Sequence, residues 1–206
     1  MTENKKPRGY FDYFLAIDCE TSGMSFGTDD PSINTKTGQV YQSVSWGLVV
    51  VDATTLKTVE ELYIEIKWDG ESEWDKRAEK VHGLSLAYLE ENGMTSEEAV
   101  VAIAGLILKY WGPDVPVCLA GHNVQTFDMF FLKRLLRSQG IEIKFGNRHI
   151  DTNSIGFGVY QTYNSDDLFD VVGCAKRDKH NALDDARNVV RVIRVTRSLA
   201  NECFGG

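Results

Sequence analysis

The sequence has few cysteines and no long apolar run. Its cysteines, Cys19, Cys118, Cys174 and Cys203, form no C-x-x-C pair, so neither a zinc site nor a thiol redox centre is indicated. Cys19 and Cys118 lie in apolar runs, where we expect buried free thiols. No stretch approaches the roughly 20 apolar residues of a membrane-spanning helix. The polar N-terminus lacks the apolar centre of a secretory signal. These absences predict a cytoplasmic protein without membrane segments.

The sequence also lacks an excess of positive charge. It has 22 basic and 30 acidic residues, a net charge of −8. This balance argues against a protein that holds nucleic acid on a broad basic surface. A nucleic-acid substrate would have to be bound locally, a few nucleotides at a time. The length of 206 residues favours one domain, predicted over residues 11–203, after a disordered tail at residues 1–10.

The first third of the chain has the pattern of β-strands. Three apolar or alternating runs predict an antiparallel meander: Tyr13–Asp18, Val44–Val51 and Thr58–Trp68. Residues 24–42 between the first two runs are polar and contain glycine and proline. That is long for a connection between strands, so we predict a surface insertion there.

The rest of the chain favours helices that alternate with short strands. Helices are predicted at 95–111, 127–137, 151–162 and 182–200, with another that opens at Asp166 or Asp167. Residues Val117–Ala120 predict a fourth strand. The pattern predicts an α/β fold with a central mixed sheet, first antiparallel and then parallel, flanked by helices on both faces.

Four carboxylates stand in three separate segments. Asp18 and Glu20 are two residues apart on a strand, so both project from one face, roughly 7 Å apart. The alternative is that both side chains lie in water just beyond the end of the strand and have no functional role. Asp128 and Asp185 each start a helix, where a capping or dipole role is the alternative. Asp184 fits the role of a carboxylate beside the helix dipole.

His180 precedes Asp185 by five residues, so both side chains can reach one cleft. A neutral imidazole suits the removal of a proton from water at physiological pH. Four converging carboxylates cannot all ionise cheaply without cations. Two Mg²⁺ or Mn²⁺ ions resolve the repulsion and suit oxygen ligands. The chemistry indicated is hydrolytic phosphoryl transfer.

These motifs resemble those of the DEDD superfamily of 3′–5′ exonucleases, in its histidine-containing, DnaQ-like DEDDh branch. The segment 17–24, IDCETSGM, resembles the first motif, and residues 123–128 resemble the second. The segment 180–186, HNALDDA, resembles the third motif, H-x-A-x-x-D-A, and VHGLS at 81–85 resembles a segment between the first two. The resemblance implies a ribonuclease H-like fold.

The resemblance also implies roles for individual residues. Two metal ions would be held by Asp18, Glu20, Asp128 and Asp185, and His180 would deprotonate the attacking water. The terminal nucleotide and the last bases would be contacted by Thr21, Ser22, Met24, Val81, His82, Asn123 and Phe127. Asn123 and Asp128 are five residues apart, whereas proofreading members usually have four, so a bulge is expected at Thr126.

The implied function is a metal-dependent 3′–5′ exonuclease that acts on single-stranded nucleic acid and releases nucleoside 5′-monophosphates, with DNA somewhat favoured. An RNase T-like or oligoribonuclease-like exoribonuclease is the alternative, because the wider second motif resembles the oligoribonuclease branch. A non-catalytic nucleic-acid-binding or polymerase accessory module is a distant alternative. A homodimer and a replication or repair partner stay open, with Trp68, Trp74 and Trp111 as interface candidates beside a role in packing.

Overall fold

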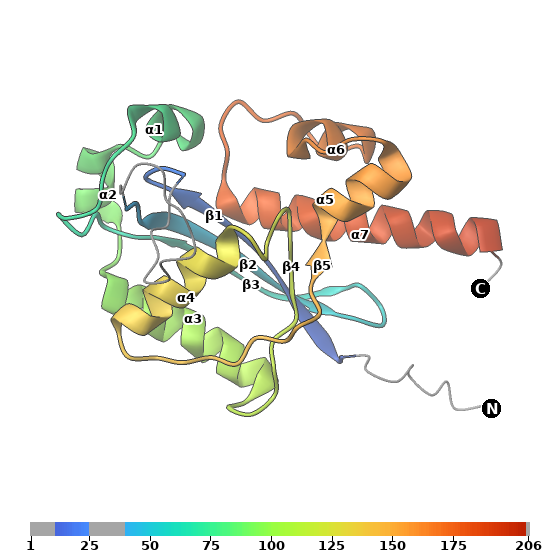
Figure 1. The fold of residues 1–206 in the computed structure, drawn as a ribbon, viewed down its shortest axis with the longest axis horizontal. Helices are drawn as coiled ribbons and strands as arrows, with labels where there is room; N and C mark the ends of the chain where they lie inside the picture. Colours follow the sequence, from blue (N-terminus) through green and yellow to red (C-terminus); the bar gives the residue numbers. More distant parts are fainter. Residues whose placement is uncertain (1–10, 25–39, 205–206) are drawn as a thin grey trace, which may run out of the picture.

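The computed structural model describes residues 11–24 and 40–204, which build a mixed β-sheet covered by helices (Figure 1). The predicted tail at 1–10 and most of the predicted insertion at 24–42 lie outside the described residues. Among the described helices, none combines the length and the apolar character that crossing a bilayer requires.

The sheet has five strands in the order β3-β2-β1-β4-β5. Their bounds are β1 Tyr13–Thr21, β2 Ser43–Asp52, β3 Thr58–Glu65, β4 Leu119–Gly121 and β5 Ile150–Asp151. The first three pair antiparallel, and β4 and β5 continue the sheet parallel to β1. The predicted mixed sheet is confirmed, with β1 at its centre.

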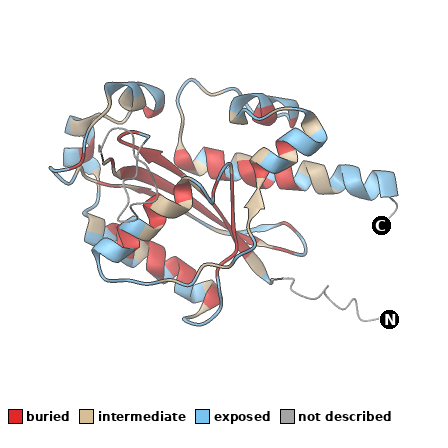
Figure 2. Ribbon diagram, in the orientation of Figure 1, coloured by how far each residue is buried: buried red, intermediate tan, exposed pale blue. Residues whose placement is uncertain are grey.

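Helices cover both faces of this sheet. Their bounds are α1 Lys76–His82, α2 Leu86–Asn92, α3 Ser96–Trp111, α4 Asp128–Ser138, α5 Thr152–Ile155, α6 Ser165–Val171 and α7 Ala182–Phe204, with a π-helical turn η1 at Gly156–Tyr160. Helices α3 and α4 pack on one face and α6 and α7 on the other, and each pair encloses its own hydrophobic cluster. In Figure 2 the strands β1, β2 and β4 between these two layers are almost entirely buried.

The alternation along β1 decides which face carries its acidic residues. Leu15, Ile17 and Cys19 belong to the hydrophobic cluster under α3 and α4. Phe14 and Ala16 belong to the cluster under α7. Successive side chains of a strand point to opposite faces, so Asp18 and Glu20 continue the α7 side. The β1 carboxylates therefore face the helix that carries Asp185.

Most predicted elements are present, and some end elsewhere. Thr95 caps α3 through a capping box with Glu98, as its sequence predicts. The predicted third strand is shorter and ends at Glu65. The predicted helix from Asp151 to Thr162 is divided into α5 and η1, with Asp151 as its N-cap.

One predicted helix start is wrong, and three short elements were not predicted. Helix α6 is capped by Asn164, whose Oδ1 accepts the N–H groups of Asp166 and Asp167, so these two aspartates lie in the first turn. Strand β5 has only two residues, and α1 and α2 have seven each. Elements this short have no readable periodicity.

The three tryptophans considered as interface candidates all have packing roles. Trp111 is buried in the hydrophobic cluster under α3 and α4. The half-buried Trp68 and Trp74 donate their Nε1–H groups to the Ser72 carbonyl at 2.8 Å and to Glu79 Oε2 at 2.6 Å. The buried Trp111 is thus a core residue, and an interface role for the half-buried Trp68 and Trp74 stays a prediction.

Gly47 sets how closely α7 approaches the sheet. It pairs with Asp18 in the β1–β2 register, on the face that α7 covers. The backbone of Ala182 and Leu183, the first turn of α7, lies directly over Gly47, where a Cβ atom would collide with the Ala182 carbonyl. The absence of a side chain at residue 47 thus brings the start of α7 against the acidic end of β1.

Replacing Gly47 with alanine should destabilise the protein by about 1–3 kcal/mol, because the added methyl group meets backbone atoms that cannot rotate away. Urea unfolding followed by circular dichroism measures this loss. Gly105→Ala is the matched control, since a methyl group at this position in α3 meets no atom within 4 Å. The control should gain about 0.5–1 kcal/mol from better helix propensity. Equal stability of the two variants would contradict the close approach of α7.

Candidate active site

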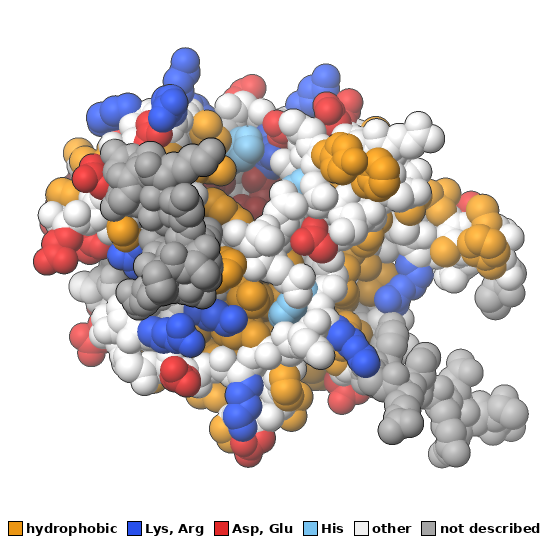
Figure 3. All heavy atoms as spheres, in the orientation of Figure 1, with side chains coloured by type: hydrophobic (Ala, Val, Ile, Leu, Met, Phe, Trp, Pro, Cys, Tyr) orange, Lys and Arg blue, Asp and Glu red, His pale blue; other side chains and the backbone are white. Residues whose placement is uncertain are grey.

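A cleft of about 670 Å³ opens where β1 ends. Figure 3 shows it as a hollow with acidic and histidine side chains inside. Side chains from β1, the end of α1 and the β4–α4 turn line it, together with His180. The lining includes Asp18, Glu20, Thr21, Met24, Val81, His82, His122, Asn123, Phe127, Ser165 and His180.

The four predicted carboxylates lie around the end of β1, two of them on the surface of this cleft and two, Asp128 and Asp185, buried behind it. Asp18 and Glu20 line it directly. Asp128, the first residue of α4, and Asp185, in the first turn of α7, are each 3% exposed. Oδ1 of Asp128 accepts the backbone N–H of Cys19 at 3.0 Å, which ties α4 to the strand segment between Asp18 and Glu20.

The pKa values of three of these carboxyl groups, Asp18, Glu20 and Asp128, are raised by burial and by neighbouring negative charges. Burial is the largest cause for each of them, and it raises the pKa of Glu20 to about 7 and the pKa of Asp128 to about 7. The pKa of Asp18 is also well above its usual range, because it is buried beside Asp128 and Glu20. Carboxyl groups with such pKa values at neutral pH are characteristic of a site that binds cations or transfers protons.

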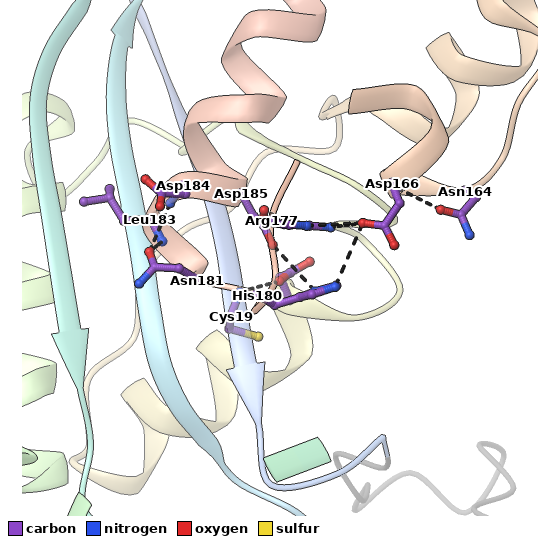
Figure 4. Close-up of polar contacts among 10 residues, drawn as sticks. Cys19, Asn164, Asp166, Arg177, His180, Asn181, Leu183, Asp184 and Asp185 are labelled. Carbon is purple, nitrogen blue, oxygen red and sulfur yellow. Dashed lines mark hydrogen bonds and ion pairs between the residues drawn. The ribbon is translucent and has the colours of Figure 1, made fainter. Parts of the chain in front are cut away.

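Arg177 supplies a positive charge inside this acidic group. Its guanidinium forms an ion pair with Asp185, and Nη2 donates to Asp166 Oδ1 at 2.6 Å. The guanidinium also lies over the ring of Phe169, 5.2 Å from its centroid. Figure 4 shows Arg177 reaching from the loop before α7 to a position between Asp185 and Asp166. Its charge lowers the pKa values of Asp18 and Glu20, against the effect of burial.

His180 lies at the mouth of the cleft, beside Asp185. Its Nδ1 is 3.7 Å from Asp185 Oδ2, and its Nε2 is 4.0 Å from Asp166 Oδ1. The backbone N–H of His180 donates to the Val81 carbonyl at 3.2 Å, which holds the loop before α7 against the end of α1. Burial and the charge of Arg177 lower the pKa of His180, so its imidazole is neutral at physiological pH.

Three of these side chains can reach one ion. Ligand atoms of Glu20, His180 and Asp185 all lie within 4.8 Å of one another. Oε1 of Glu20 is buried and has no hydrogen-bond partner within the described residues. A buried carboxylate oxygen without a partner is costly unless a cation or a proton satisfies it. The side chains present therefore fit a hard divalent cation.

Most of the predicted nucleotide-contacting residues line the cleft. Met24 is 78% exposed at its rim, and Val81 and Phe127 add apolar surface. His82 is buried, and its Nδ1 accepts the N–H of Leu84 at 3.0 Å. Burial lowers the pKa of His82 to about 4, so its ring is neutral. The surface formed by Met24, Val81 and Phe127, with the neutral His82 beside them, can therefore pack against a base without adding charge.

Ser22 is placed differently from its prediction. It is fully buried and is absent from the cleft lining. Its hydroxyl donates to the Glu73 carbonyl at 2.7 Å and accepts the N–H of Gln42 at 3.0 Å. These bonds join the end of β1 to two other segments, so Ser22 contributes to the architecture of the cleft and not to its surface.

The wider second motif is accommodated by a turn that begins at Asn123. Asn123 adopts a left-handed conformation with φ 61°, and its N–H donates to Asp151 Oδ1 at 3.0 Å. The Asn123 carbonyl accepts the N–H groups of Thr126 and Phe127 at 3.0 and 3.1 Å. The additional residue is thus absorbed by the turn from 123 to 127, and Asp128 still reaches β1.

Two residues with evident electrostatic roles were not identified from the sequence. Arg177 stands in the charged run 176–180, which reads as a solvated loop, and Asp166 was read only as a helix start. Their pairing depends on how the segment between α6 and α7 folds back over the cleft. The sequence signal that could have found Arg177 is its position three residues before His180.

The family model for exonucleases, named for RNase T, matches residues 15–193. The chain belongs to the exonuclease family. The match confirms the predicted membership of an exonuclease family, and the assignment to the DEDDh branch agrees with it and stays a prediction. No curated protein sequence matches the chain.

Solved structures of exonucleases share the fold. E. coli exonuclease I in complex with a dT13 oligonucleotide superimposes with a TM-score of 0.74 at 14% identity, over 94% of this chain and 43% of that one. The nuclease domain of 3′hExo, a DEDDh family member bound to rAMP, gives a TM-score of 0.65 at 16% identity, over 95% of both chains. This chain thus spans less than half the length of exonuclease I. The ribonuclease H-like fold of such exonucleases is confirmed.

Replacing Arg177 with methionine should destabilise the metal-free protein. The change leaves the buried Asp185 without its counterion, at a cost of about 3 kcal/mol near neutral pH. Urea unfolding in the presence of a chelator measures the loss. Arg187→Met is the control, because Arg187 pairs with Glu61 and Asp184 at the surface and should change stability by less than about 1 kcal/mol. Equal losses of stability in both variants would show that Arg177 does not act as the counterion of Asp185.

The stability of the metal-free protein should fall as the pH rises from about 4 to about 7. Over this range the folded protein keeps protons on Glu20 and Asp128 that the unfolded chain releases. The folded state binds more protons, so each increase in pH favours unfolding through these two groups. Thermal unfolding in chelator at about pH 5 and about pH 8 compares the two protonation states for the wild type and a Glu20→Gln variant. The wild type should lose more stability than the variant.

Proposed function

We propose that the protein is a metal-dependent 3′–5′ exonuclease that hydrolyses single-stranded nucleic acid and releases nucleoside 5′-monophosphates. The observation that carries the proposal is the convergence of Glu20, His180 and Asp185 within 4.8 Å, at a cleft that also holds Asp18. Chain segments far apart in the sequence supply these groups. Membership of the exonuclease family is independent support.

In this proposal Asp18, Glu20, Asp128 and Asp185 hold two divalent cations, Mg²⁺ or Mn²⁺. The raised pKa values of Asp18, Glu20 and Asp128 and the unpartnered Glu20 Oε1 support a cation site at the end of β1. Bound divalent cations would neutralise phosphate charge, lower the pKa of an attacking water and stabilise the leaving oxygen. The backbone N–H of Cys19 holds Asp128 in position for this role.

His180 is the proposed general base. Its imidazole is neutral because burial and Arg177 lower its pKa, so it can accept a proton from water. Asp185 lies 3.7 Å from Nδ1, and Asp166 lies 4.0 Å from Nε2. Either carboxylate can stabilise the imidazolium once the proton has moved. The proton would thus pass from the attacking water to the His180 imidazole, whose positive charge these two carboxylates would then offset.

The apolar part of the cleft is the proposed site for the 3′-terminal nucleotide. Met24, Val81 and Phe127 offer surface on which a base can pack, and the neutral His82 backs them. Thr21 and Asn123 line the same cleft and are proposed to lie beside the sugar and phosphate groups. Packing against such surfaces is sequence-tolerant, because every base has a π-face.

Single-stranded DNA is the favoured substrate, and RNA is the second candidate. The single-stranded oligonucleotide bound to exonuclease I supports DNA, and the rAMP bound to 3′hExo supports RNA. The five-residue spacing from Asn123 to Asp128 resembles the oligoribonuclease branch and also favours RNA. The overall acidic charge is compatible with either strand, because both would be held locally in the cleft.

Asp185→Asn should reduce hydrolysis by about 10²–10³-fold or more, because it removes a charge at which the transition state is stabilised. Asp184→Asn is the matched control: Asp184 is the neighbouring residue, but it pairs with Arg187 at the surface. The control should retain wild-type activity on a 5′-labelled single strand. Circular dichroism checks that both variants fold. Full activity of Asp185→Asn would contradict the proposed role of Asp185 in holding a metal ion.

Matched 5′-labelled DNA and RNA oligonucleotides, incubated with Mg²⁺, Mn²⁺ or a chelator, test polarity, sugar preference and metal dependence together. The expected product is a ladder that shortens from the unlabelled 3′ end and is absent with chelator. Early cleavage at internal positions would instead identify an endonuclease. A strong preference for RNA would reverse the order of the two candidate substrates.

A further inference from the structure

Two aromatic side chains stack on each other at the surface. Phe157 in η1 and Tyr163 after it have ring centroids 4.9 Å apart and an interplanar angle of 18°. They are 57% and 63% exposed. Aromatic side chains are usually buried in a core or in an interface, so an exposed stacked pair indicates a binding surface.

The backbone holds this pair in place. Phe157 lies in the π-helical turn Gly156–Tyr160, a feature often found at functional sites. The Tyr163 carbonyl accepts two side-chain donors, His122 Nε2 at 2.9 Å and Asn153 Nδ2 at 3.1 Å. Beneath them, the hydroxyl groups of Tyr160 and Thr196 lie 3.1 Å apart, which joins η1 to α7.

The aromatic pair is continuous with the candidate active site. His122, which binds the Tyr163 carbonyl, lines the cleft, and so does Ser165, two residues after Tyr163. Figure 3 shows hydrophobic side chains gathered over the α5–α6 region, on the same face as the hollow and next to it. A strand that leaves the cleft on this side would pass over the two rings.

We propose that Phe157 and Tyr163 form a second nucleotide subsite, which stacks a base upstream of the nucleotide being removed. The proposal rests on the proposed function and names the part of the substrate that the cleft does not hold. A protein with a net charge of −8 gains little from broad phosphate contacts. Stacking on exposed rings supplies affinity for a single strand without basic residues and without sequence preference.

The alternative partner for the two exposed rings is a second copy of the chain. Two aromatic rings bury about 150–250 Å² each, whereas a stable interface buries about 800 Å² per partner. The pair therefore has the size of a base-stacking site and falls short of a stable dimer contact. Its continuity with the cleft also favours the substrate strand.

The test compares long and short substrates. A dinucleotide has only one base upstream of the nucleotide being removed, so its hydrolysis reports mainly on the catalytic centre. For the wild type, kcat/KM should be higher for an oligonucleotide of about eight nucleotides, a length within the usual site size for single-strand binding. In a Phe157→Ala/Tyr163→Ala variant the ratio of long to short kcat/KM should fall by about 5- to 100-fold. The loss should appear in KM and not in kcat.

Two further variants separate stacking from folding. Phe157→Tyr/Tyr163→Phe keeps both rings and should keep the wild-type ratio of long to short kcat/KM. Phe157→Leu/Tyr163→Leu keeps apolar surface without aromatic rings, and its ratio should fall. Phe204→Ala is the control for an exposed aromatic residue elsewhere, at the end of α7. Fluorescence anisotropy with a labelled oligonucleotide, in an Asp185→Asn background, measures binding without turnover and should show the same order.

Each outcome is distinct. No hydrolysis of either substrate by the wild type would overturn the proposed function. Hydrolysis with an unchanged length ratio in both the alanine and the leucine variants would overturn the subsite alone. A wild type that elutes as a dimer in size-exclusion chromatography, with a monomeric alanine variant, would assign the rings to a contact between copies and overturn the subsite.

Discussion

The repulsion among four neighbouring carboxylates is the constraint on which this structure depends. Glu20, Asp128 and Asp185 are buried, and Asp18 lies beside them on the surface of the cleft. Each negative charge raises the energy of the others, and burial raises it further. Such a group persists in a fold only when protons or cations neutralise it. The arrangement around the end of β1 therefore follows from the need to hold these side chains together.

Several features of the chain meet this need without a metal ion. Protons on Glu20 and Asp128 remove charge near neutral pH, and Arg177 adds a cation beside Asp185. The Cys19 N–H binds Asp128, and Gly47 lets α7 approach the sheet. The acidic side chains thus lie on rigid elements, which is the property that precise coordination requires. The protons on Glu20 and Asp128 would be replaced by divalent ions when these bind.

The parts of this site that were predictable depend on local patterns. Strand alternation places Asp18 and Glu20 on one face from the sequence alone, and the last helix was predicted from residue 182, where α7 begins. Arg177 was not predictable, because its partners Asp166 and Asp185 meet only after a loop folds back. Ser22 was misplaced because its burial is decided by Gln42 and Glu73, which are 20 and 51 residues away. Contacts of this range have no signature in a local pattern.

The position of α7 has a consequence for synthesis of the chain. The strands β1, β2 and β3 are neighbours in sequence and can pair as soon as they emerge from the ribosome. His180 and Asp185 emerge much later, and until α7 docks one face of β1 and β2 has no cover. Before α7 is made, the nascent protein therefore carries three of its four acidic residues, Asp18, Glu20 and Asp128, and lacks His180. The proposed cleavage of nucleic acid therefore requires α7 to have docked on the sheet, because His180 and Asp185 reach the end of β1 only then.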